Sequence, residues 1–291
     1  MSEIVFLNHQ YIPKEEASIS INDRGFHFGD GVYEVIKYYT GKPFMMHGHI
    51  HRLTRSLKEV RINYTGPEKL VSVCDNLIRM NHLENTYAGV YIQVTRGSHQ
   101  RMHAFPENIA PTVCAEAFEM PARKEKLGLG IKVVTRPDIR WMRCDIKSVS
   151  LIANVLMLQE AVEMGAGECI FVRNGIVTEA THSSVLAVKN GRVITHPDSN
   201  LILPGITKEV VKEICMQCQI PIDEKPFSLE ELYQMDELFL AGTGNEIMPV
   251  TMVDEKLITN GYPGNITRTL QRLFFGLTYE QLSGDKWWQF Q

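Results

Sequence analysis

Apolar and polar positions in the first 120 residues follow the spacings of both helices and strands. Apolar residues recur at helical spacing in two segments, which predicts helices over 48–60 and 67–81. Short runs rich in β-branched and aromatic residues predict strands over 4–7, 32–39, 43–46, 88–96 and 110–118. A glycine-punctuated loop is expected over 23–31. This part of the chain is therefore expected to form an α+β domain.

The remainder of the chain predicts short strands separated by turns, with fewer helices. Strands are expected over 131–135, 168–173, 176–179, 184–189, 192–195 and 237–241. Helices are expected over 151–164, after Pro204-Gly205 and near 228–234. The pairs Asn174-Gly175 and Asn190-Gly191 predict tight hairpins, because both residue types tolerate the positive φ angles of such turns.

A charged stretch at 120–130, flanked by proline and glycine, separates these two parts. Such a composition is typical of a connection between domains. We expect a small N-terminal domain at 1–120, a linker at 121–126 and a larger C-terminal domain at 127–283. The apolar end of the chain at 286–291 is expected to pack against a neighbouring part of the protein.

Composition excludes several classes of function. The chain has 291 residues, 44% of them hydrophobic and 22% charged, and a net charge of −4. An acidic protein without a block of lysines and arginines is not expected to bind nucleic acid. Neither a membrane-spanning apolar stretch nor the basic start of a signal peptide is present. We therefore expect a cytoplasmic protein with no membrane partner and with reduced cysteines.

Cysteines and histidines do not predict a metal site. Only Cys215 and Cys218 lie close together among the six cysteines, and they fall inside a helical pattern without a second pair. His47, His49 and His51 alternate at the start of an expected helix, where their side chains diverge around the axis. We expect buried free thiols and no metal ion.

Lys147 is the most informative single residue. It lies between a strand-like run and an apolar helix, with Ile146 before it and Val149 and Leu151 after it. Partial burial lowers the pKa of an ammonium group, which is what an amine needs in order to attack an aldehyde. The alternative is a lysine that packs its stem on apolar neighbours and keeps its charged end in water. That alternative is the commoner one for an isolated lysine.

Other polar features fall at the ends of predicted elements, where sites are usually built. Glu179 ends a strand, and a carboxylate there could hold a proton on a ring nitrogen. The segments 205–207 and 242–244 could supply backbone amides to a phosphate, although a plain helix cap and a plain turn are the alternatives. Arg52 could add a charge to such a phosphate site, or could be a solvated helix residue. Arg101 and His103, in a long loop, could grip a carboxylate or simply lie at the surface.

An imine-forming lysine, a carboxylate for a ring nitrogen and a phosphate site together match the requirements of pyridoxal 5′-phosphate. At this point the chain resembles the class IV (fold-type IV) aminotransferases, most closely the bacterial D-amino-acid aminotransferases. The resemblance covers roughly residues 4–275. Its most specific stretches are Asp23-Arg-Gly-Phe-His-Phe-Gly-Asp-Gly-Val-Tyr-Glu-Val, Gln93-Val-Thr-Arg-Gly, Arg101-x-His-x-Phe-Pro-Glu-Asn and Asp138-Ile-Arg-Trp-Met-Arg-Cys-Asp-Ile-Lys-Ser.

The resemblance implies a role for each matching residue. Lys147 is implied to be the Schiff-base lysine and proton shuttle, and Glu179 the partner of the pyridine nitrogen. The implied phosphate contacts are Arg52, Ile206, Thr207 and Thr243. The implied trap for the substrate α-carboxylate consists of Tyr33, Arg101 and His103, of which the last two reach across a dimer interface. Glu34 and Arg140 match positions beside the cofactor.

The implied activity is a ping-pong exchange of an amino group between a D-amino acid, of the D-alanine or D-glutamate type, and a 2-oxo acid. The implied fold is mixed, with a small N-terminal α/β domain and a larger, mixed, barrel-like C-terminal domain. The implied assembly is a homodimer with the cofactor at the interface of the two domains. In this family, the side of the pocket that holds the carboxylate decides whether D or L substrates react. Arg101 and His103 therefore matter most for the substrate. The sequence leaves open which D-amino acid is preferred and how far L substrates react.

The chain departs from the family pattern at two places. The usual Glu-Gly-Ser-Ser-Ser-Asn is Glu-Ala-Thr-His-Ser-Ser at 179–184, which puts Thr181 and His182 near the cofactor or substrate. The segment 242–245, Gly-Thr-Gly-Asn, looks more like the branched-chain aminotransferase version. The alternatives are a branched-chain L-amino-acid aminotransferase, an aminodeoxychorismate-type lyase, and a non-catalytic protein that carries pyridoxal phosphate.

Overall fold

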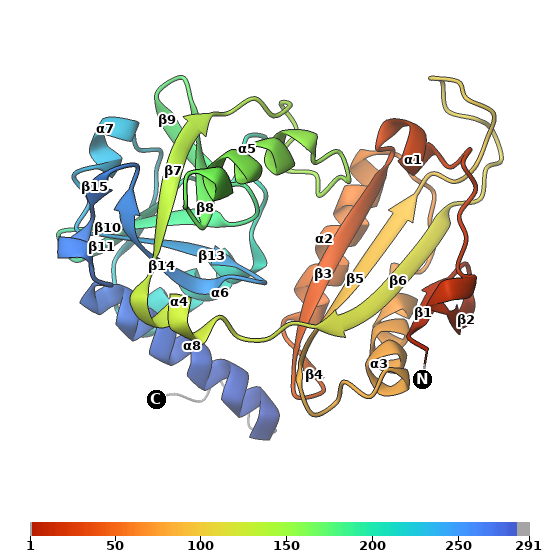
Figure 1. Cartoon of the computed structure of the whole chain (residues 1–291), viewed down its shortest axis with the longest axis horizontal. Coiled ribbons are helices and arrows are strands. Elements are labelled where there is room, and N and C mark those ends of the chain that lie inside the picture. The colour runs from red at the N-terminus through yellow and green to blue at the C-terminus, as the bar shows by residue number, and fades with distance from the viewer. Residues whose placement is uncertain (1, 284–291) are drawn as a thin grey trace. The chain divides into compact units, whose positions relative to one another are not determined.

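The computed structural model describes residues 2–283 (Figure 1), so the apolar segment at 286–291 lies outside the described residues. Contacts divide the chain into two compact units. Met1–Ala122 and Ile146–Leu151 belong to the first, and Arg123–Asp145 and Ile152–Glu280 belong to the second. The division into domains at 1–120 and 127–283 stays a prediction. The short segment that carries Lys147 belongs to the first unit although the chain on both sides of it belongs to the second.

The first unit is built on a six-stranded antiparallel sheet in the order β2-β1-β6-β5-β3-β4. Figure 1 shows β3, β5 and β6 running side by side. The strands are β1 (Ile4–Leu7), β2 (Gln10–Pro13), β3 (Gly31–Tyr39), β4 (Lys42–Pro43), β5 (Tyr87–Thr95) and β6 (Thr112–Glu119). The helices are α1 (Arg24–Phe28), α2 (Met46–Glu59) and α3 (Leu70–Met80), with 3-10 turns at Lys14–Glu16 and Pro67–Lys69.

The core of this unit explains why its periodic segments were predictable. Leu53 and Leu57 of α2 and Leu77 of α3 are buried against alternate residues of the sheet, among them Ile36 and Ile92. Helical residues three and four apart lie on one face, and alternate strand residues lie on one face of a sheet. The helices predicted over 48–60 and 67–81 and the long strands are therefore confirmed, within a few residues at their ends.

The second unit is built on a nine-stranded mixed sheet in the order β12-β11-β10-β13-β14-β7-β8-β9, with β15 paired to β14. This sheet is curled into a half-barrel. Its strands are β7 (Ile131–Pro137), β8 (Glu168–Arg173), β9 (Ile176–Ala180), β10 (Ser184–Lys189), β11 (Arg192–Thr195), β12 (Ile222–Glu224), β13 (Glu237–Gly242), β14 (Glu246–Val253) and β15 (Lys256–Leu257). Its helices are α4 (Lys124–Leu129), α5 (Ile152–Glu163), α6 (Ile206–Gln217), α7 (Leu229–Leu232) and α8 (Asn265–Ser283), with a 3-10 turn at Thr259–Gly261.

Both predicted Asn-Gly hairpins are confirmed. Asn174 and Gly175 join β8 to β9 with φ angles of 52° and 80°. Asn190 and Gly191 join β10 to β11 with φ angles of 50° and 75°. Two successive positive φ angles are what a two-residue hairpin turn needs to match the twist of its strands.

The glycine-punctuated segment 23–31 differs from the loop that the sequence predicts, because it contains the short helix α1. The Asp23 side chain caps this helix by accepting a hydrogen bond from the Gly25 N–H at 2.8 Å. Gly29 ends the helix in the left-handed region with a φ of 64°. The motif therefore caps the short helix at Asp23 and ends it at Gly29.

The prediction of a strand directly before Lys147 is also wrong. β7 ends at Pro137 and α5 begins at Ile152, and the residues between them are irregular apart from one isolated bridge at Ser148. Polar side chains in this stretch form ion pairs instead of alternating across a sheet, as Arg143 and Asp145 do at 3.0 Å.

Several elements were not predicted. The stretch at 120–130 contains helix α4, and β2, β12, β14, β15 and α8 had no prediction. β14 illustrates the reason, because Pro249 interrupts an otherwise apolar run and a proline inside a run argues against a central strand. The surrounding sheet nevertheless pairs Pro249 with Phe239 of β13.

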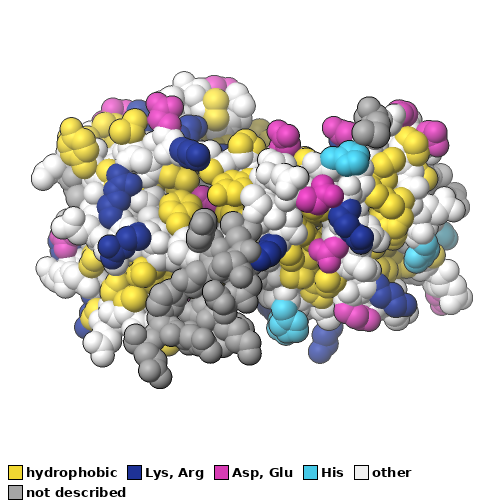
Figure 2. Space-filling view, turned by 90° about the horizontal axis from the view of Figure 1, so that it is seen from below, with side chains coloured by type: hydrophobic (Ala, Val, Ile, Leu, Met, Phe, Trp, Pro, Cys, Tyr) yellow, Lys and Arg dark blue, Asp and Glu magenta, His cyan; other side chains and the backbone are white. Residues whose placement is uncertain are grey.

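The surface is mixed in character. Figure 2 shows acidic and basic side chains interspersed with hydrophobic ones among the coloured residues of that face. Among the described residues, no helix is both long enough and apolar enough to cross a membrane. All six cysteines are free, and Cys74, Cys144, Cys169 and Cys215 are buried.

Candidate active site

Lys147 is attached to the edge of the first unit's sheet by backbone hydrogen bonds. The Tyr33 N–H donates to the Lys147 carbonyl at 3.0 Å, and the Val149 N–H donates to the Gly31 carbonyl at 3.1 Å. The Lys147 N–H donates to the Ser56 hydroxyl of α2 at 3.3 Å. The side chain is half-buried, as predicted, and its Nζ lies 4.3 Å from the centre of the Tyr33 ring. An amine in this position is held by its backbone while its end stays reachable.

A buried cluster of charged residues lies on the same strand and on helix α2. Glu34 is fully buried and accepts hydrogen bonds from Arg52 Nε at 2.7 Å and from Arg52 Nη2 at 2.9 Å. Its Oε2 also lies 2.8 Å from His49 Nδ1. Burial alone would raise the pKa of Glu34, but Arg52 and His49 hold this pKa well below its ordinary value. Burial lowers the pKa of His49, and Glu34 opposes this shift without reversing it, while the charges of Arg52 and Lys147 add to it.

This cluster changes how the predicted phosphate contact Arg52 is understood. Two nitrogen atoms of its guanidinium bind Glu34, so the group is held in a fixed orientation. Its contact with a phosphate stays a prediction. The sequence analysis missed the pairing, although His49 and Arg52 are three residues apart on a helix and therefore share a face. That spacing was the available signal.

Replacing Glu34 with glutamine should lower the free energy of unfolding by roughly 3–5 kcal/mol, because it removes the carboxylate that holds the buried Arg52 charge. The depressed pKa of Glu34 means that its contribution is complete above the ordinary carboxyl pKa and is lost as the pH falls through the depressed one. Urea unfolding at neutral pH measures the difference.

The matched control is Glu255→Gln, which removes an exposed partner of Lys132 and should cost less than about 1 kcal/mol. Equal losses in the two variants would contradict a special role for the buried cluster.

In the second unit, Glu179 lies near the end of β9 and is buried. Its Oε1 pairs with Arg140, and its Oε2 accepts a hydrogen bond from the Leu203 N–H at 3.0 Å. Arg140 is itself fixed by Asp138, whose Oδ1 lies 2.9 Å from the Arg140 Nε, and by the Phe171 ring 4.4 Å below its guanidinium carbon. Burial raises the pKa of Glu179, while Arg140 and the Leu203 N–H oppose that rise. The carboxylate is thus oriented by two donors.

The start of helix α6 offers backbone amides for an anion. Gly205 precedes the helix, and no side chain caps it. The first amides of a helix have no partner within it and carry the positive end of its dipole. Thr207 is buried in the first turn. A Cβ atom at Gly205 would lie only 2.6 Å from the Ser184 hydroxyl, so this close approach requires glycine.

The turn between β13 and β14 packs beside the same place. A Cβ atom at Gly242 would lie 2.7 Å from the Ser183 hydroxyl, and Thr243 follows in the turn, half-buried. The two segments predicted to bind phosphate therefore approach consecutive serines at the start of β10. The Ala180 N–H donates to the Ser183 carbonyl at 2.8 Å, so Glu179 lies one turn away. The segments that carry Glu179, Thr207 and Thr243 thus meet near the start of β10.

Thr181 and His182, where the chain departs from the family pattern, belong to a network of polar contacts. The Thr181 hydroxyl donates to Oε1 of the fully buried Glu168, and the other oxygen of Glu168 lies 2.8 Å from His182 Nδ1. Asn245 Nδ2 lies 3.2 Å from His182 Nε2 and donates to the Ser183 hydroxyl at 2.9 Å. Sequence reasoning missed Glu168, which lies on β8, and the contacts of Asn245, which lies in the turn between β13 and β14.

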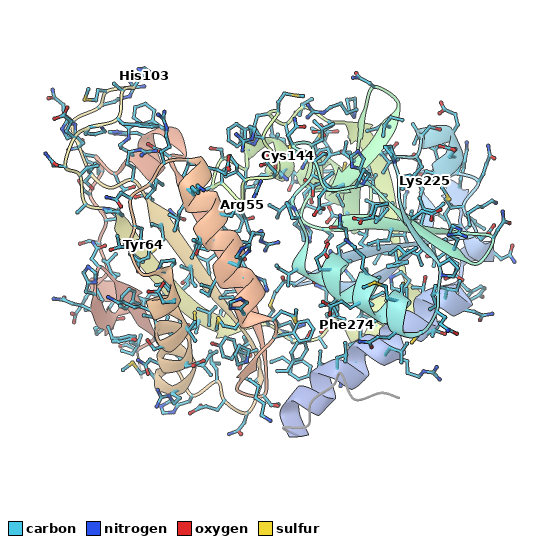
Figure 3. The ribbon with its side chains drawn as sticks, turned by 180° about the vertical axis from the view of Figure 1, so that it is seen from behind. Arg55, Tyr64, His103, Cys144, Lys225 and Phe274 are labelled. Carbon is cyan, nitrogen blue, oxygen red and sulfur yellow. The ribbon has the colours of Figure 1, made fainter. Side chains whose placement is uncertain are left out.

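The predicted carboxylate trap divides between two places in the first unit. Arg101 and His103 are exposed on the loop between β5 and β6, and Figure 3 labels His103 at the outer end of this loop. Both contact Phe28, with the Arg101 guanidinium carbon 5.1 Å and the His103 ring 5.4 Å from the centre of its ring. Tyr33 instead stacks on Tyr91 at 5.6 Å. Among the described residues, no hydrogen bond or ring contact joins Tyr33 to the other two.

Comparison with known proteins identifies the family of this chain. The family model "Amino-transferase class IV" matches residues 31–253. D-alanine aminotransferase of Staphylococcus epidermidis is 42% identical over 273 residues, which are 93% of this chain and 96% of that protein. D-alanine aminotransferase of Bacillus licheniformis is 38% identical over 268 residues, or 92% of this chain and 94% of that protein.

Solved structures give the same family. The crystal structure of the branched-chain amino acid aminotransferase of Escherichia coli matches with a TM-score of 0.89 and 27% identity, over 96% of this chain and 95% of that chain. The fold and the enzyme class predicted from the sequence are therefore confirmed. This chain belongs to the class IV aminotransferases.

Proposed function

We propose that this protein transfers the amino group of a D-amino acid, of the D-alanine or D-glutamate type, to a 2-oxo acid in a ping-pong reaction. Relatives named D-alanine aminotransferase, which are 38–42% identical over most of the chain, support this proposal. The observation that carries it is the pair Arg101 and His103 on one exposed loop, with two side chains that can bind a carboxylate.

Class IV aminotransferases use pyridoxal 5′-phosphate, and the residues of each unit fit this cofactor. In the second unit, Glu179 would hold the ring nitrogen, and the backbone amides of Ile206 and Thr207 with the turn at Thr243 would hold the phosphate. The glycines at 205 and 242 support this assignment, because they let the two segments approach the adjacent hydroxyls of Ser184 and Ser183 closely. In the first unit, Lys147 would supply the amine and Arg52 a positive charge for the phosphate. When bound, the cofactor supplies an electron sink for the substrate Cα.

The chain's own residues would hold and move protons and bind the substrate. Glu179, oriented by Arg140 and the Leu203 N–H, would hold a proton on the ring nitrogen. Lys147 Nζ would accept the proton of the substrate Cα and return it. Arg101 and His103 would bind the substrate carboxylate and so select the enantiomer.

A branched-chain L-amino-acid aminotransferase is the second candidate. The observations that favour it are the likeness to the Escherichia coli branched-chain enzyme and the segment 242–245, whose Gly-Thr-Gly-Asn resembles that class. The identity is 27% to that enzyme and 42% to a D-alanine aminotransferase, so the D-specific function is supported better.

A half-reaction screen separates the two candidates. Purified protein, loaded with cofactor and dialysed, is mixed with D-alanine, D-glutamate, L-leucine or L-valine, and the absorption of the cofactor is followed. A D-specific transaminase should bleach the absorption with the D-amino acids and regain it with a 2-oxo acid. Faster bleaching with L-leucine or L-valine would replace the D-specific function by the branched-chain one.

We also propose that the protein is a cytoplasmic homodimer in which Arg101 and His103 serve the partner subunit. Exposed apolar side chains near their loop support a second copy as the neighbour, since Ile21 is 76% and Phe26 77% exposed. Six free cysteines support a reducing compartment. Light scattering in solution tests the dimer, and a monomeric mass at full activity would exclude it.

Replacing Arg101 with alanine should raise the apparent KM for D-alanine and D-glutamate by roughly 30- to 1000-fold. The reason is that a charge-assisted contact to a carboxylate is worth on the order of 2–4 kcal/mol in a partly closed site. Cofactor affinity should change little, because the predicted phosphate contacts are other residues. Steady-state kinetics and cofactor titration measure the two effects. Unchanged kinetics with D substrates would contradict the trap.

A further inference from the structure

The loop that carries Arg101 and His103 is held by a buried arginine, Arg24, which the proposed reaction does not use. Arg24 is 3% exposed and lies in α1. Its Nη1 donates to the Met102 carbonyl at 2.6 Å and to the Ala104 carbonyl at 3.4 Å, and its Nη2 donates to the His103 carbonyl at 3.3 Å. One guanidinium therefore binds three consecutive carbonyl groups directly after Arg101.

Arg24 is itself fixed by a shared carboxylate. Its Nε donates to Asp30 Oδ2 at 2.7 Å. Asp30 also binds Arg96 through two hydrogen bonds, from Nε at 2.8 Å and from Nη2 at 2.9 Å. Arg96 in turn donates to the Arg61 and Val60 carbonyls, both at 2.7 Å, just beyond the end of α2. The guanidinium that holds the loop is thus tied to the helical layer of the unit.

Aromatic contacts join the same network to the loop's side chains. Phe28 lies against two arginines, with the guanidinium carbons of Arg24 and Arg101 at 4.8 Å and 5.1 Å from its ring centre. Phe105, farther along the loop, lies against the Arg96 guanidinium at 3.6 Å. Cation–π contacts of this kind add to the hydrogen bonds and fix side-chain direction. The loop is therefore attached by its backbone and by two aromatic rings.

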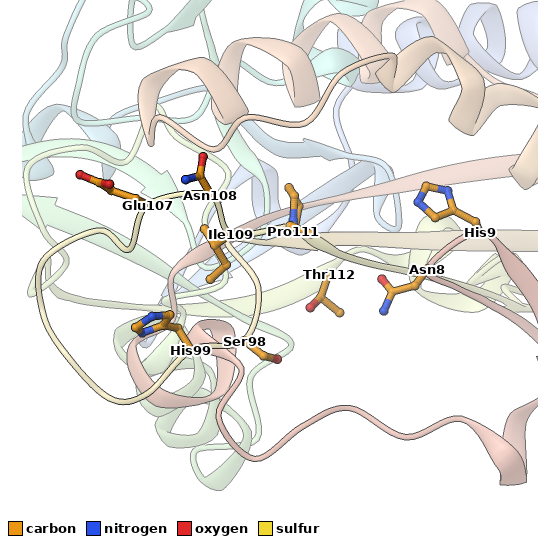
Figure 4. Close-up of a pocket in the computed structure, with 10 residues that line it drawn as sticks. Asn8, His9, Ser98, His99, Glu107, Asn108, Ile109, Pro111 and Thr112 are labelled. Carbon is orange, nitrogen blue, oxygen red and sulfur yellow. The ribbon is translucent and has the colours of Figure 1, made fainter.

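The start of this loop is also held by its backbone, since the Arg24 N–H donates to the Gly97 carbonyl at 2.9 Å and the His99 N–H donates to the Asn22 carbonyl at 3.1 Å. Figure 4 shows a pocket between its two ends, where residues such as His99, Glu107 and Asn108 lie opposite His9 of the first hairpin. The pocket has a volume of about 510 Å³. The pocket separates the two ends of the loop, and the contacts of Arg24 and Arg96 hold the part between them, at residues 102–105.

We propose that Arg24 is a positioning residue for substrate recognition, which holds the backbone at 102–104 and the Phe28 ring so that Arg101 and His103 are pre-organised to bind a carboxylate. The inference rests on the proposed function of those two residues. Pre-organisation strengthens binding because less conformational freedom is lost when the substrate arrives. Lysine cannot replace Arg24, since one ammonium group lacks the planar set of donors that reaches a carboxylate and three carbonyls together.

The test compares Arg24→Lys with the wild type in three measurements. The first is the steady-state kinetics of D-alanine, and the second is the dissociation constant of propionate by calorimetry. The third is the half-reaction with D-alaninol, an amine that lacks the carboxylate. We expect the KM of D-alanine and the dissociation constant of propionate to rise roughly 5- to 20-fold, with kcat and the D-alaninol rate changed less than about threefold. Arg192→Lys, at an exposed pair with Asp223, is the control.

Equal losses with D-alanine and D-alaninol would overturn the inference, because a general loss of structure affects both. In the Arg101→Ala background, Arg24→Lys should add less than about a twofold effect, since it acts through the missing side chain. If the double variant instead showed the product of the two separate increases in KM, the inference would be overturned and the proposed function would stand. If Arg101→Ala alone left D-alanine kinetics unchanged, the proposed carboxylate trap would fail and the inference with it, whereas the half-reaction screen decides the transaminase activity itself.

Phe105→Leu gives an independent test if Arg24→Lys does not fold. It removes the ring beneath Arg96 while leaving Arg24 in place, and the exposed ring position should tolerate leucine. We expect a rise of roughly two- to fivefold in the KM of D-alanine and no change with D-alaninol. Phe118→Leu, an exposed phenylalanine on β6 of the same unit, is its control. Identical kinetics for the two variants would show that the loop needs no such attachment.

Discussion

Replacing Lys147 with alanine should lower kcat by at least about 10⁴-fold, because the variant lacks the amine that we propose to hold the cofactor and to move the proton of the substrate Cα. Another lysine should not take over: the buried Lys208, for example, is bound to Asp198 at 2.5 Å. Steady-state kinetics with D-alanine and a 2-oxo acid measure the loss. Borohydride reduction of the wild type should fix the cofactor mass on the peptide that contains residue 147, and this adduct should be missing from the variant.

The fold should survive this substitution. Lys147 is half-buried, its backbone makes the contacts to β3 and α2, and its side chain contacts the Tyr33 ring. We therefore expect a change in unfolding free energy within about 1 kcal/mol. Lys132→Ala, at a surface ion pair, is the control that should keep its activity. Turnover at the wild-type rate by Lys147→Ala would refute the assignment.

Replacing Glu179 with glutamine should slow removal of the substrate Cα proton by about 10³-fold while cofactor stays bound. A carboxylate favours the protonated ring nitrogen, and a neutral amide does not, so the electron sink is weakened. An electrostatic contact that acts on developing charge in a dry site is commonly worth this factor. Stopped-flow measurement of the half-reaction with D-alanine gives the rate directly.

Glu160→Gln is the matched control, because Glu160 pairs with Arg136 at the surface. Cofactor should remain on both variants, since the start of α6 and the turn at Thr243 are untouched. Identical single-turnover rates for Glu179→Gln and the wild type would show that the carboxylate has another role.

Local patterns predicted the elements whose burial is periodic. Leu53 and Leu57 of α2 and the Asn-Gly turns carry their signal within a few residues, so sequence alone located them. α1 was missed because one helical turn is too short for any period, and its cap at Asp23 lies within a run of glycines that also suits a loop. β14 was missed because its partner strands, not its own residues, accommodate Pro249.

In the candidate site, too, the sequence predicted single residues better than the contacts between them. Lys147 and Glu179 could be singled out by their place at the ends of predicted elements and by resemblance. Their immediate partners could not, since Glu34 meets Arg52 and Glu168 meets His182 only through tertiary folding. Long-range pairs of this kind leave no spacing in the sequence, except where two of the residues share a helix face, as His49 and Arg52 do.

The return of residues 146–151 to the first unit has a consequence for biosynthesis. The hydrogen bonds that Tyr33 and Gly31 make with Lys147 and Val149 join segments more than 110 residues apart in the chain. A ribosome releases the N-terminal segment first, and domains usually fold as they emerge. The hydrogen bonds at the edge of β3 can therefore form only after residue 149 has been synthesised. A fragment that stops at residue 122 would lack both Lys147 and the segment that pairs with the edge of β3.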